Sequence, residues 1–333
     1  MRETKPVLTD ANSQDGKEVP APEKRRNLAN KTMSTFVIPP NEKELFSRLD
    51  EVITGASKSF VEIGVALRAN IAGLIATVSV PYTLAAKSAA DRHWQGIHTA
   101  ARIRSLKSDA ELGLDREVNA LSHARSAMAR FVDSPEGHEA LIEGTLNFLD
   151  TLQSYEAVIR AADELIRQGV VLCWSAFEVA ARDCFVAYLN AKPAQTLTLL
   201  GDPVAKRRFE LGKFSVETLA THNFNLSERM GSLLAQQQDL SDVFSVKSVY
   251  QALFPADVRL SESLDDSNLR LLSLRRNLIV HQCGVIDETY LTASKSGQQV
   301  GERLKLSPDN LEEHVGTVIK VATNIIDAVA TAV

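Results

Sequence analysis

The sequence is poor in turn-forming residues. Its 333 residues include 16 glycines and 11 prolines, together about 8%, against ~12% in an average protein. Few glycines and prolines mean few tight turns, and no run of alternating apolar and polar residues predicts a sheet. No segment of the chain repeats, which excludes a solenoid. We therefore predict an all-α fold.

Cysteine is also scarce, and it is not arranged for a metal. Cys173, Cys184 and Cys283 are odd in number, widely spaced and without a Cys-x-x-Cys pair, a pattern that predicts reduced thiols and no zinc site. His93 and His98 lie five residues apart without nearby cysteine or converging carboxylates, so we expect surface residues there. The sequence thus predicts neither a metal nor another cofactor.

A net positive charge is absent. The chain has 37 basic and 42 acidic side chains and a formal charge of −5, so it has no broad basic face. Any contact with RNA must therefore be made at a local site. The apolar fraction of 44% and the charged fraction of 24% are ordinary for a soluble protein and exclude wholesale disorder, collagen and a multi-span membrane protein.

Only one long stretch lacks charge. The first residues carry no apolar run, so we expect no secretory signal and a cytoplasmic protein. Residues 69–86 are uncharged but rich in alanine and interrupted by polar residues and by Pro81, which should break the helix. We expect a buried helix of a soluble protein and no membrane contact. The alternative is a membrane-associated sensor anchored through this stretch.

Composition divides the chain into three parts. Residues 1–40 are polar and proline-containing, which predicts a disordered tail. Residues 41–131 predict an N-terminal helical module, and residues 135–333 a C-terminal helical domain that Ser134 and Pro135 begin. In this domain an apolar stripe predicts a helix over 141–166, Gly169 suggests a bend, and a nearly all-apolar helix follows over 170–189. Residues 191–265 form an insertion of irregular helical sequence.

The residues with the clearest chemistry lie in one predicted helix. Asp266 can cap a helix that Gly284 can end in a left-handed turn, and it contains Arg276, Asn277 and His281. Asn277 and His281 are four residues apart and share a face, which the long side chain of Arg276 can reach. Arginine can bind a phosphate, asparagine can donate to it, and histidine can move a proton near neutral pH.

These groups suit metal-independent cleavage of RNA. A base activates the ribose 2′-hydroxyl, which attacks the adjacent phosphate, and arginine stabilises the charge of the transition state. DNA lacks this hydroxyl. One histidine per chain is little for both acid and base catalysis, so the sequence favours a homodimer in which two motif helices face each other across a two-fold axis.

The segment RRNLIVHQCGVIDETYL resembles the signature of the HEPN superfamily, an arginine and a histidine separated by four to six residues with a polar residue after the arginine. The helix IRQGVVLCWSAFEVAARDCF, with its acidic Glu178, is similar to the first core helix of these domains. The resemblance covers roughly residues 150–333. It implies a HEPN-like helical bundle, dimerisation through the motif helices, and an endoribonuclease of toxin–antitoxin or antiviral defence systems.

Carried to this sequence, the resemblance makes Arg276 the phosphate-binding group, Asn277 its support, His281 the acid or base, and Glu178 a residue that orients the site. Cys283 stands where some HEPN toxins have a tyrosine that a partner antitoxin modifies, which puts that form of control in doubt. An antitoxin or another defence component remains an expected partner.

Two further points stay open. The basic run of Lys206, Arg207 and Arg208 could steer RNA towards the site, although a short charge run is more often a solvated face.

The family also contains members that do not cleave RNA. The alternative function is therefore a non-catalytic RNA-binding or protein-interaction dimer, in which Arg276 and His281 only set the dimer geometry.

Overall fold

The computed structural model describes residues 28–106, 114–209, 215–237 and 240–333. Within these ranges the chain is all-α, as predicted, and the only β pairing is a single bridge between Val285 and Arg303. The α-helices in chain order are α2 (Glu42–Thr54), α3 (Lys58–Val78), α4 (Val80–Leu106), α5 (Leu114–Val132), α6 (Pro135–Gln153), α7 (Glu156–Ala191), α8 (Thr196–Gly201), α9 (Pro203–Phe209), α10 (Val216–Thr221), α11 (Met230–Gln237), α12 (Val243–Leu253), α13 (Val258–Leu264), α14 (Ser267–Gln282), α15 (Glu288–Ser294) and α16 (Pro308–Ala332). A 3-10 turn, Pro193–Gln195, joins α7 to α8.

Short polar side chains determine where several helices begin. The Ser134 hydroxyl accepts a hydrogen bond from the Gly137 amide at 3.0 Å, and the Asp266 carboxylate accepts one from the Asn268 amide at 3.0 Å. Ser307 and Asn310 form a reciprocal capping box at the start of α16. Each cap satisfies an amide that has no partner inside the helix. The predicted starts at Ser134 and Asp266 are therefore confirmed.

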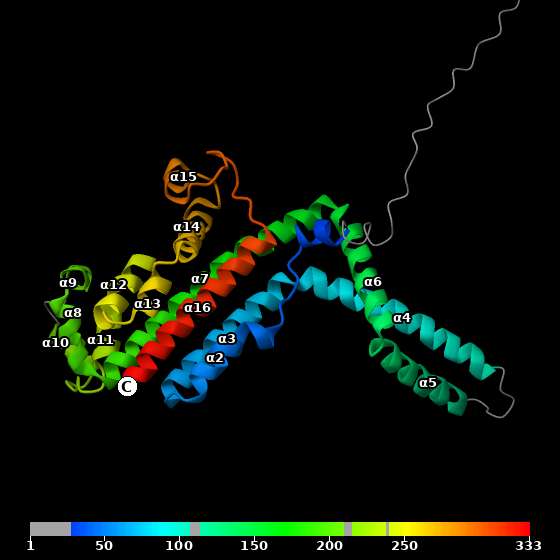
Figure 1. Cartoon of the computed structure of the whole chain (residues 1–333), viewed down its shortest axis with the longest axis horizontal. Helices are drawn as coiled ribbons and strands as arrows, with labels where there is room; N and C mark the ends of the chain where they lie inside the picture. Colours follow the sequence, from blue (N-terminus) through cyan, green and yellow to red (C-terminus); the bar gives the residue numbers. More distant parts are fainter. Residues whose placement is uncertain (1–27, 107–113, 210–214, 238–239) are drawn as a thin grey trace, which may run out of the picture.

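Helix α7 is the axis of the core. Its 36 residues extend about 54 Å, and α3, α11, α14 and α16 pack around it (Figure 1). Trp174, Phe177 and Phe185 of α7 are fully buried. The predicted bend at Gly169 is wrong, because α7 continues through this residue and the break lies at Ser154, between α6 and α7. Gly169 instead allows two neighbouring helices to approach: a Cβ there would lie 2.8 Å from Leu311 on α16.

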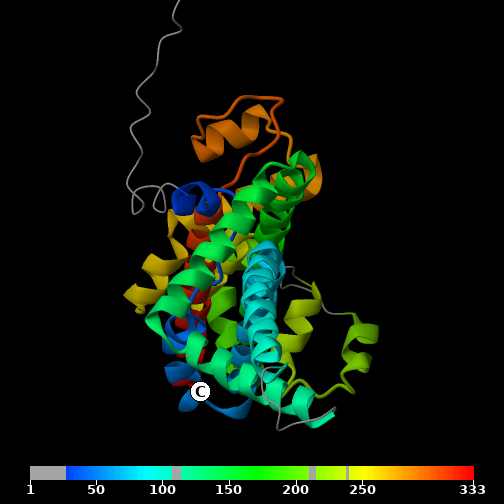
Figure 2. The same cartoon turned by 90° about the vertical axis from the view of Figure 1, so that its right-hand side faces the viewer.

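The N-terminal half does not form one separate module. Helices α2 and α3 share a continuous core with α7 and α16, in which Phe46, Phe60 and Ile71 pack with Trp174 and Ile325. Helices α4, α5 and α6 instead project from one end of this bundle, and we call them the arm (Figures 1 and 2). The change of direction comes at Ser79, with Pro81 in the first turn of α4. The expected boundary near residue 133 thus lies within the arm.

The expected tail is also shorter than predicted. Residues 28–33 are helical, and the Phe36 side chain is 2% exposed in a small cluster with Ala85, Leu149 and Ala162. This cluster joins the chain before α2 to the arm and to the first turns of α7. The buried Phe36 ring, together with hydrogen bonds from Gln153 to the Lys31 carbonyl and the Thr35 hydroxyl, holds this polar segment on the arm. The rest of the predicted tail, residues 1–27, lies outside the described residues.

The insertion at 191–265 is part of the bundle. Within its described part, α11, α12 and α13 contribute Leu234, Val249 and Leu260 to the main core. The Tyr250 hydroxyl donates a hydrogen bond to the carbonyl of Ala181 in α7 at 2.6 Å, and burial raises the pKa of this phenol. These helices cover the C-terminal half of α7.

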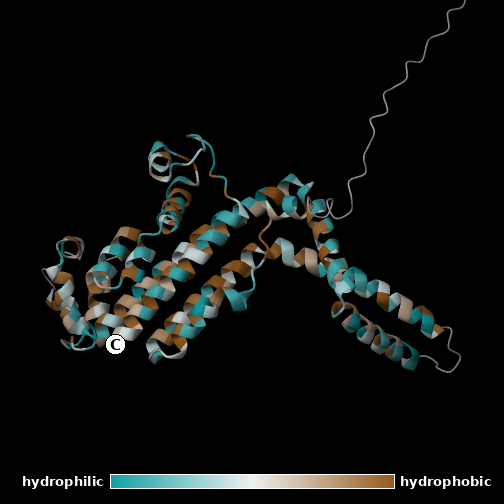
Figure 3. Cartoon of the chain, in the orientation of Figure 1, coloured by the Kyte–Doolittle hydropathy of each residue, from teal (hydrophilic) through white to brown (hydrophobic). Residues whose placement is uncertain are grey.

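Two helices in the described part of the chain, α3 and α16, are long and apolar enough to cross a membrane by length and composition. In the structure both pack against α7, and 33% and 61% of their most apolar windows are buried. Figure 3 shows hydrophobic residues along α3, α7 and α16, where these helices lie side by side. The predicted uncharged stretch 69–86 spans the turn between α3 and α4 and contributes Ile71, Leu74 and Val78 to the core.

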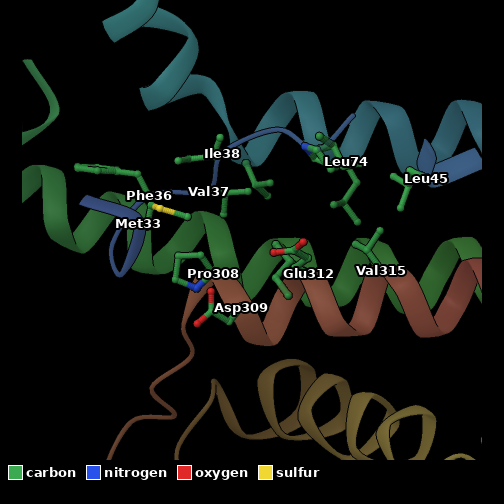
Figure 4. Close-up of a pocket in the computed structure, with 14 residues that line it drawn as sticks. Met33, Phe36, Val37, Ile38, Leu45, Leu74, Pro308, Asp309, Glu312 and Val315 are labelled. Atoms are coloured by element: carbon green, nitrogen blue, oxygen red, sulfur yellow. The ribbon is translucent and has the colours of Figure 1, made fainter. Parts of the chain in front are cut away.

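The segment before α2 also forms a small pocket with α3 and the start of α16. Apolar side chains line most of it, including Phe36, Ile38 and Leu74, and its volume is about 90 Å³ (Figure 4). Asp309 and Glu312 are exposed residues of its wall. None of the predicted site residues lines this pocket.

Candidate functional site

The motif helix is α14, and its ends are well defined. Leu269, Leu272 and Leu278 are buried and attach it to the bundle. After Gln282 the chain turns through two residues with positive φ, Cys283 at 53° and Gly284 at 75°, and the Gly284 amide donates to the carbonyl of Leu278 at 3.0 Å. The Cys283 amide donates to the same carbonyl, so two amides of the left-handed turn satisfy one carbonyl near the end of the helix. The left-handed end predicted at Gly284 is confirmed, and it includes Cys283.

Arg276 is the half-buried member of the motif. Its side chain is 22% exposed, its Nη1 donates to Asn277 Oδ1 at 3.0 Å, and its Nη2 lies 3.9 Å from Glu178 Oε2. The Asn277 amide oxygen therefore holds one side of the guanidinium and the Glu178 carboxylate faces the other. A guanidinium has five N–H donors, so these contacts leave donors for a further anion.

Glu178 is held by the core helix on which it lies. Its Oε2 accepts a hydrogen bond at 3.0 Å from the indole Nε1 of Trp174, one turn earlier on α7, and the indole is fully buried. Trp174 also contacts Phe177, with ring centroids 5.4 Å apart. A carboxylate fixed by a buried indole can keep Arg276 in one orientation. The structure thus brings Glu178 next to Arg276, two residues that are 98 positions apart in the chain.

His281 differs from Arg276 in its surroundings. It is exposed in the last turn of α14, and its side chain makes no hydrogen bond or ion pair with any described residue. Around the helix axis it lies about 40° from Asn277 and about 140° from Arg276. Asn277 is also exposed and lies between the two. The described chain therefore presents the imidazole to solvent beside the amide, whereas the half-buried guanidinium lies further round the helix, beyond Asn277.

An apolar residue interrupts this polar face. Val280 is 47% exposed and lies about 40° from Arg276 and about 60° from Asn277 around α14. On α7, Leu172 and Val179 are exposed two turns apart, and Val179 follows Glu178 directly. These exposed apolar side chains thus lie on the two helices that carry Arg276 and Glu178.

A partly exposed ionic network holds the loop that follows the motif. Glu164 of α7 accepts hydrogen bonds from Arg167 Nε at 3.0 Å and from Arg303 Nη2 at 2.9 Å. A hydrogen bond from Gln168, together with these two arginines, lowers the pKa of Glu164. The Arg303 backbone pairs with Val285, and the Leu304 amide donates to the Gly284 carbonyl at 2.7 Å. The turn after His281 is thereby tied back to α7.

Sequence reasoning missed a polar pair beside the motif. Arg275 Nη1 lies 2.8 Å from Nε2 of His314, which is fully buried on α16. Because a guanidinium only donates, the Nε2 atom accepts, and the imidazole is neutral with its proton on Nδ1. Burial first, and the charge of Arg275 second, lower the pKa of His314 to about 3. The sequence did contain a pattern that indicates this burial, because His314 follows Leu311 at helical spacing in the apolar stripe of α16.

Other predicted residues lie apart from the motif. Lys206 is exposed on α9, which packs on α8 and α12, and the side chains of Arg207 and Arg208 lie outside the described residues. His98 stacks on Trp94 with centroids 5.6 Å apart, and His93 contacts Phe131 in the arm. The described residues contain no group of three or more side chains suited to hold a metal ion.

The three cysteines have different environments. Cys173 and Cys184 are buried in α7, where burial raises the pKa of both thiols. Cys283 is exposed in the turn after the motif helix. A thiol with a raised pKa is a poor nucleophile, so Cys173 and Cys184 are packing residues.

Comparison of the chain with known protein families, with curated proteins and with solved structures finds no match.

Proposed function

We propose that the protein is a metal-independent endoribonuclease of HEPN type. One observation carries the proposal: Arg276 on the motif helix lies between the Asn277 amide and the Glu178 carboxylate, with His281 exposed one turn beyond Asn277. The arrangement combines an oriented cation, a hydrogen-bonding amide and a solvent-accessible imidazole. The resemblance of the surrounding sequence to HEPN domains supports the same function.

Each residue has a defined task in the proposed reaction. His281 removes the proton of a ribose 2′-hydroxyl, and the 2′-oxygen forms a bond to the adjacent phosphorus. The bond from phosphorus to the 5′-oxygen then breaks, and that oxygen takes up a proton. The products are a 2′,3′-cyclic phosphate and a 5′-hydroxyl end. Arg276, oriented by Glu178, stabilises the charge that develops on the phosphate oxygens, and Asn277 donates its amide N–H to them.

A homodimer would complete the site. One imidazole cannot remove the first proton and deliver the second at the same moment, whereas two facing copies supply one group for each step. The exposed Val280 on α14 and the exposed Leu172 and Val179 on α7 support burial of this surface. We propose that the motif helices meet across a two-fold axis at these residues. A role in a toxin–antitoxin or antiviral system, with an antitoxin or defence partner, follows from the resemblance alone.

One observation favours the non-catalytic alternative. The Glu178 carboxylate partly neutralises Arg276, and a guanidinium that is engaged within its own chain binds a phosphate less strongly. In that case Arg276, Asn277 and His281 would set the geometry of an RNA-binding or protein-interaction dimer. The two functions differ in one measurable result, which is whether RNA is cut.

The decisive experiment compares cleavage by matched variants. Wild-type protein is incubated with a labelled single-stranded RNA and with DNA of the same sequence, both with a chelator present. We expect cleavage of RNA only. His281→Ala should lower the rate by about 10²-fold or more, and Arg276→Ala by a similar factor. Arg270→Ala removes an exposed arginine from the same helix and should retain the wild-type rate.

Cleavage by all four proteins at one rate would exclude the proposed residues. A complete absence of cleavage, with the dimer intact in both His281→Ala and wild-type protein, would favour the non-catalytic alternative. The size of each variant in solution is measured by light scattering, so that loss of the dimer is not mistaken for loss of chemistry.

A further inference from the structure

Helices α4 and α5 of the arm carry an excess of positive charge. Their described residues include seven lysines and arginines against three aspartates and glutamates, whereas the whole chain has a net charge of −5. The two helices lie side by side and project from the bundle at the end away from α8–α13 (Figure 1). The third helix of the arm, α6, carries four carboxylates and no lysine or arginine, so the local basic surface is limited to α4 and α5.

A groove runs between these two helices. It has a volume of about 680 Å³, and its apolar lining consists of Ile97 and three alanines, Ala100, Ala101 and Ala127. Its polar wall consists of two arginines and four hydrogen-bonding side chains, which are Arg104 and Ser105 of α4 and Asn119, His123, Ser126 and Arg130 of α5. Among the residues that the structure describes, no carboxylate lines it.

The polar residues follow one stripe along each helix. On α5, Asn119, His123, Ser126 and Arg130 recur every three or four residues, so they share one face. From Asn119 to Arg130 this face extends about 16 Å, which is about the length of five stacked nucleotides. Neither Arg104 nor Arg130 pairs with a carboxylate of the described residues. The nearby Glu117 instead contacts Arg102, at 3.3 Å, and His98.

The chemistry of the groove selects its ligand. Arginine, asparagine, serine and histidine can all donate hydrogen bonds, and phosphate oxygens only accept them. A protein partner would be expected to meet aromatic and apolar side chains at the centre of an interface, and the groove has no aromatic residue. The small alanine side chains allow an RNA strand to lie close to the two helices, with its phosphates between the arginines.

We infer that the groove between α4 and α5 binds the phosphodiester backbone of the RNA on which the motif helix acts. This inference rests on the proposed function for the identity of the ligand. The groove holds the strand at a distance from Arg276 and His281 and reads no base, so it raises affinity for long RNA without setting the cleavage position.

The test measures binding without cleavage. A fluorescent single-stranded RNA of about 20 nucleotides is titrated with the His281→Ala protein. The same titration is made with a protein that also carries Arg104→Gln and Arg130→Gln, which we call the double variant. Glutamine keeps the helix propensity and removes the charge. We expect affinity to fall on the order of tenfold, and the slope of log K against log salt to decrease by about 1.4, or about 0.7 for each lost phosphate contact.

The matched control is Arg125→Gln in the same background. Arg125 is an exposed arginine of α5 that does not line the groove. It should leave both the affinity and the salt slope unchanged. Equal binding by the double variant and the control would overturn the inference, and so would an equal loss in both, because then only the overall charge matters.

The two proposals can fail separately. Suppose that the wild-type protein cuts no RNA, and that the double variant loses binding whereas the control does not. The nuclease proposal would then be wrong, and the groove would remain an RNA-binding site. If instead the wild-type protein cuts RNA and the double variant binds as tightly as the control, the nuclease proposal would stand and the inference about the groove would be wrong. Circular dichroism of all variants verifies that the helices of the arm are intact.

Discussion

Arg276 Nη2 on the motif helix lies 3.9 Å from Glu178 Oε2 on α7, and the same carboxylate oxygen accepts the indole N–H of Trp174 at 3.0 Å. The longest helix of the core thus sets the position of the motif arginine through one carboxylate. Both side chains of the pair are about a quarter exposed, so the ion pair is partly screened by water. Its main effect is on orientation, since an isolated pair of this kind adds little stability.

Glu178→Gln should test this orientation. Glutamine keeps an oxygen that can accept from Trp174 but loses the charge that faces Arg276. We expect kcat for RNA cleavage to fall about tenfold to a hundredfold with little change in KM, because the guanidinium is misplaced in the transition state. Steady-state kinetics measure this split. A variant with wild-type kcat would show that Glu178 does not position Arg276.

Gly169→Ala should destabilise the core. A Cβ at this position would lie 2.8 Å from Leu311 Cδ2 and 3.0 Å from Val78 Cγ1, so both α16 and α3 would have to move. Overpacking of this kind costs about 1–3 kcal/mol, and the better helix propensity of alanine offsets about 1 kcal/mol. We expect a lower free energy of unfolding in a urea titration.

Gly73→Ala is the matched control for this prediction. Gly73 is exposed in α3, and a Cβ there meets nothing within 4 Å. The substitution should raise the free energy of unfolding by up to about 1 kcal/mol. If Gly169→Ala raised the free energy of unfolding as much as Gly73→Ala does, the space between the three helices at Gly169 would be large enough for a Cβ, and the prediction would be wrong.

Local signals made the motif helix predictable. Asp266 caps its start and Gly284 lies in its left-handed end, as their residue types require. The spacing of Asn277 and His281 also places both on one exposed side without any knowledge of the fold. Glu178 stands in an apolar helix, and its partner Arg276 is far away in the sequence, so only the packing of α14 on α7 brings the two together.

The organisation of domains could not be predicted in this way. Helix α3 has an apolar face that fits α7 as well as it would fit a separate N-terminal core, and periodicity does not say which helix it meets. The composition of residues 28–40 likewise gives no sign that Phe36 is buried against the arm. Both outcomes depend on contacts between segments that are far apart in the sequence, which local patterns do not encode.

Cys283→Gly should stabilise the protein. Cys283 has a φ of 53°, a left-handed conformation that is strained for any residue with a Cβ and free of strain for glycine. Relief of this strain, less the extra entropy of glycine in the unfolded chain, should raise the free energy of unfolding by about 0.5–1 kcal/mol. Urea titration measures the change. Cys283→Ala keeps the Cβ and should give no gain, so an equal gain in both would indicate an effect of the thiol instead.

The buried His314 should make stability depend on pH. Its pKa is about 3 in the folded protein and close to 6.5 in the unfolded chain, so the unfolded state binds the extra proton between these values. The contribution of the neutral imidazole is complete above pH 6.5, decreases as the pH falls, and is lost by about pH 3. The slope is at most about 1.4 kcal/mol per pH unit.

His314→Gln isolates this effect, because glutamine keeps an oxygen that can accept from Arg275 and does not titrate. Urea titrations of both proteins at several values between pH 4 and pH 8 give their free energies of unfolding. Wild-type protein should lose stability more steeply than the variant below pH 6.5, and the difference between the two should be constant above pH 7.5. Parallel curves over the whole range would mean that His314 has the same pKa in the folded and unfolded states. Burial and the charge of Arg275 would then not disfavour its protonation, which would overturn the neutral, acceptor role of His314.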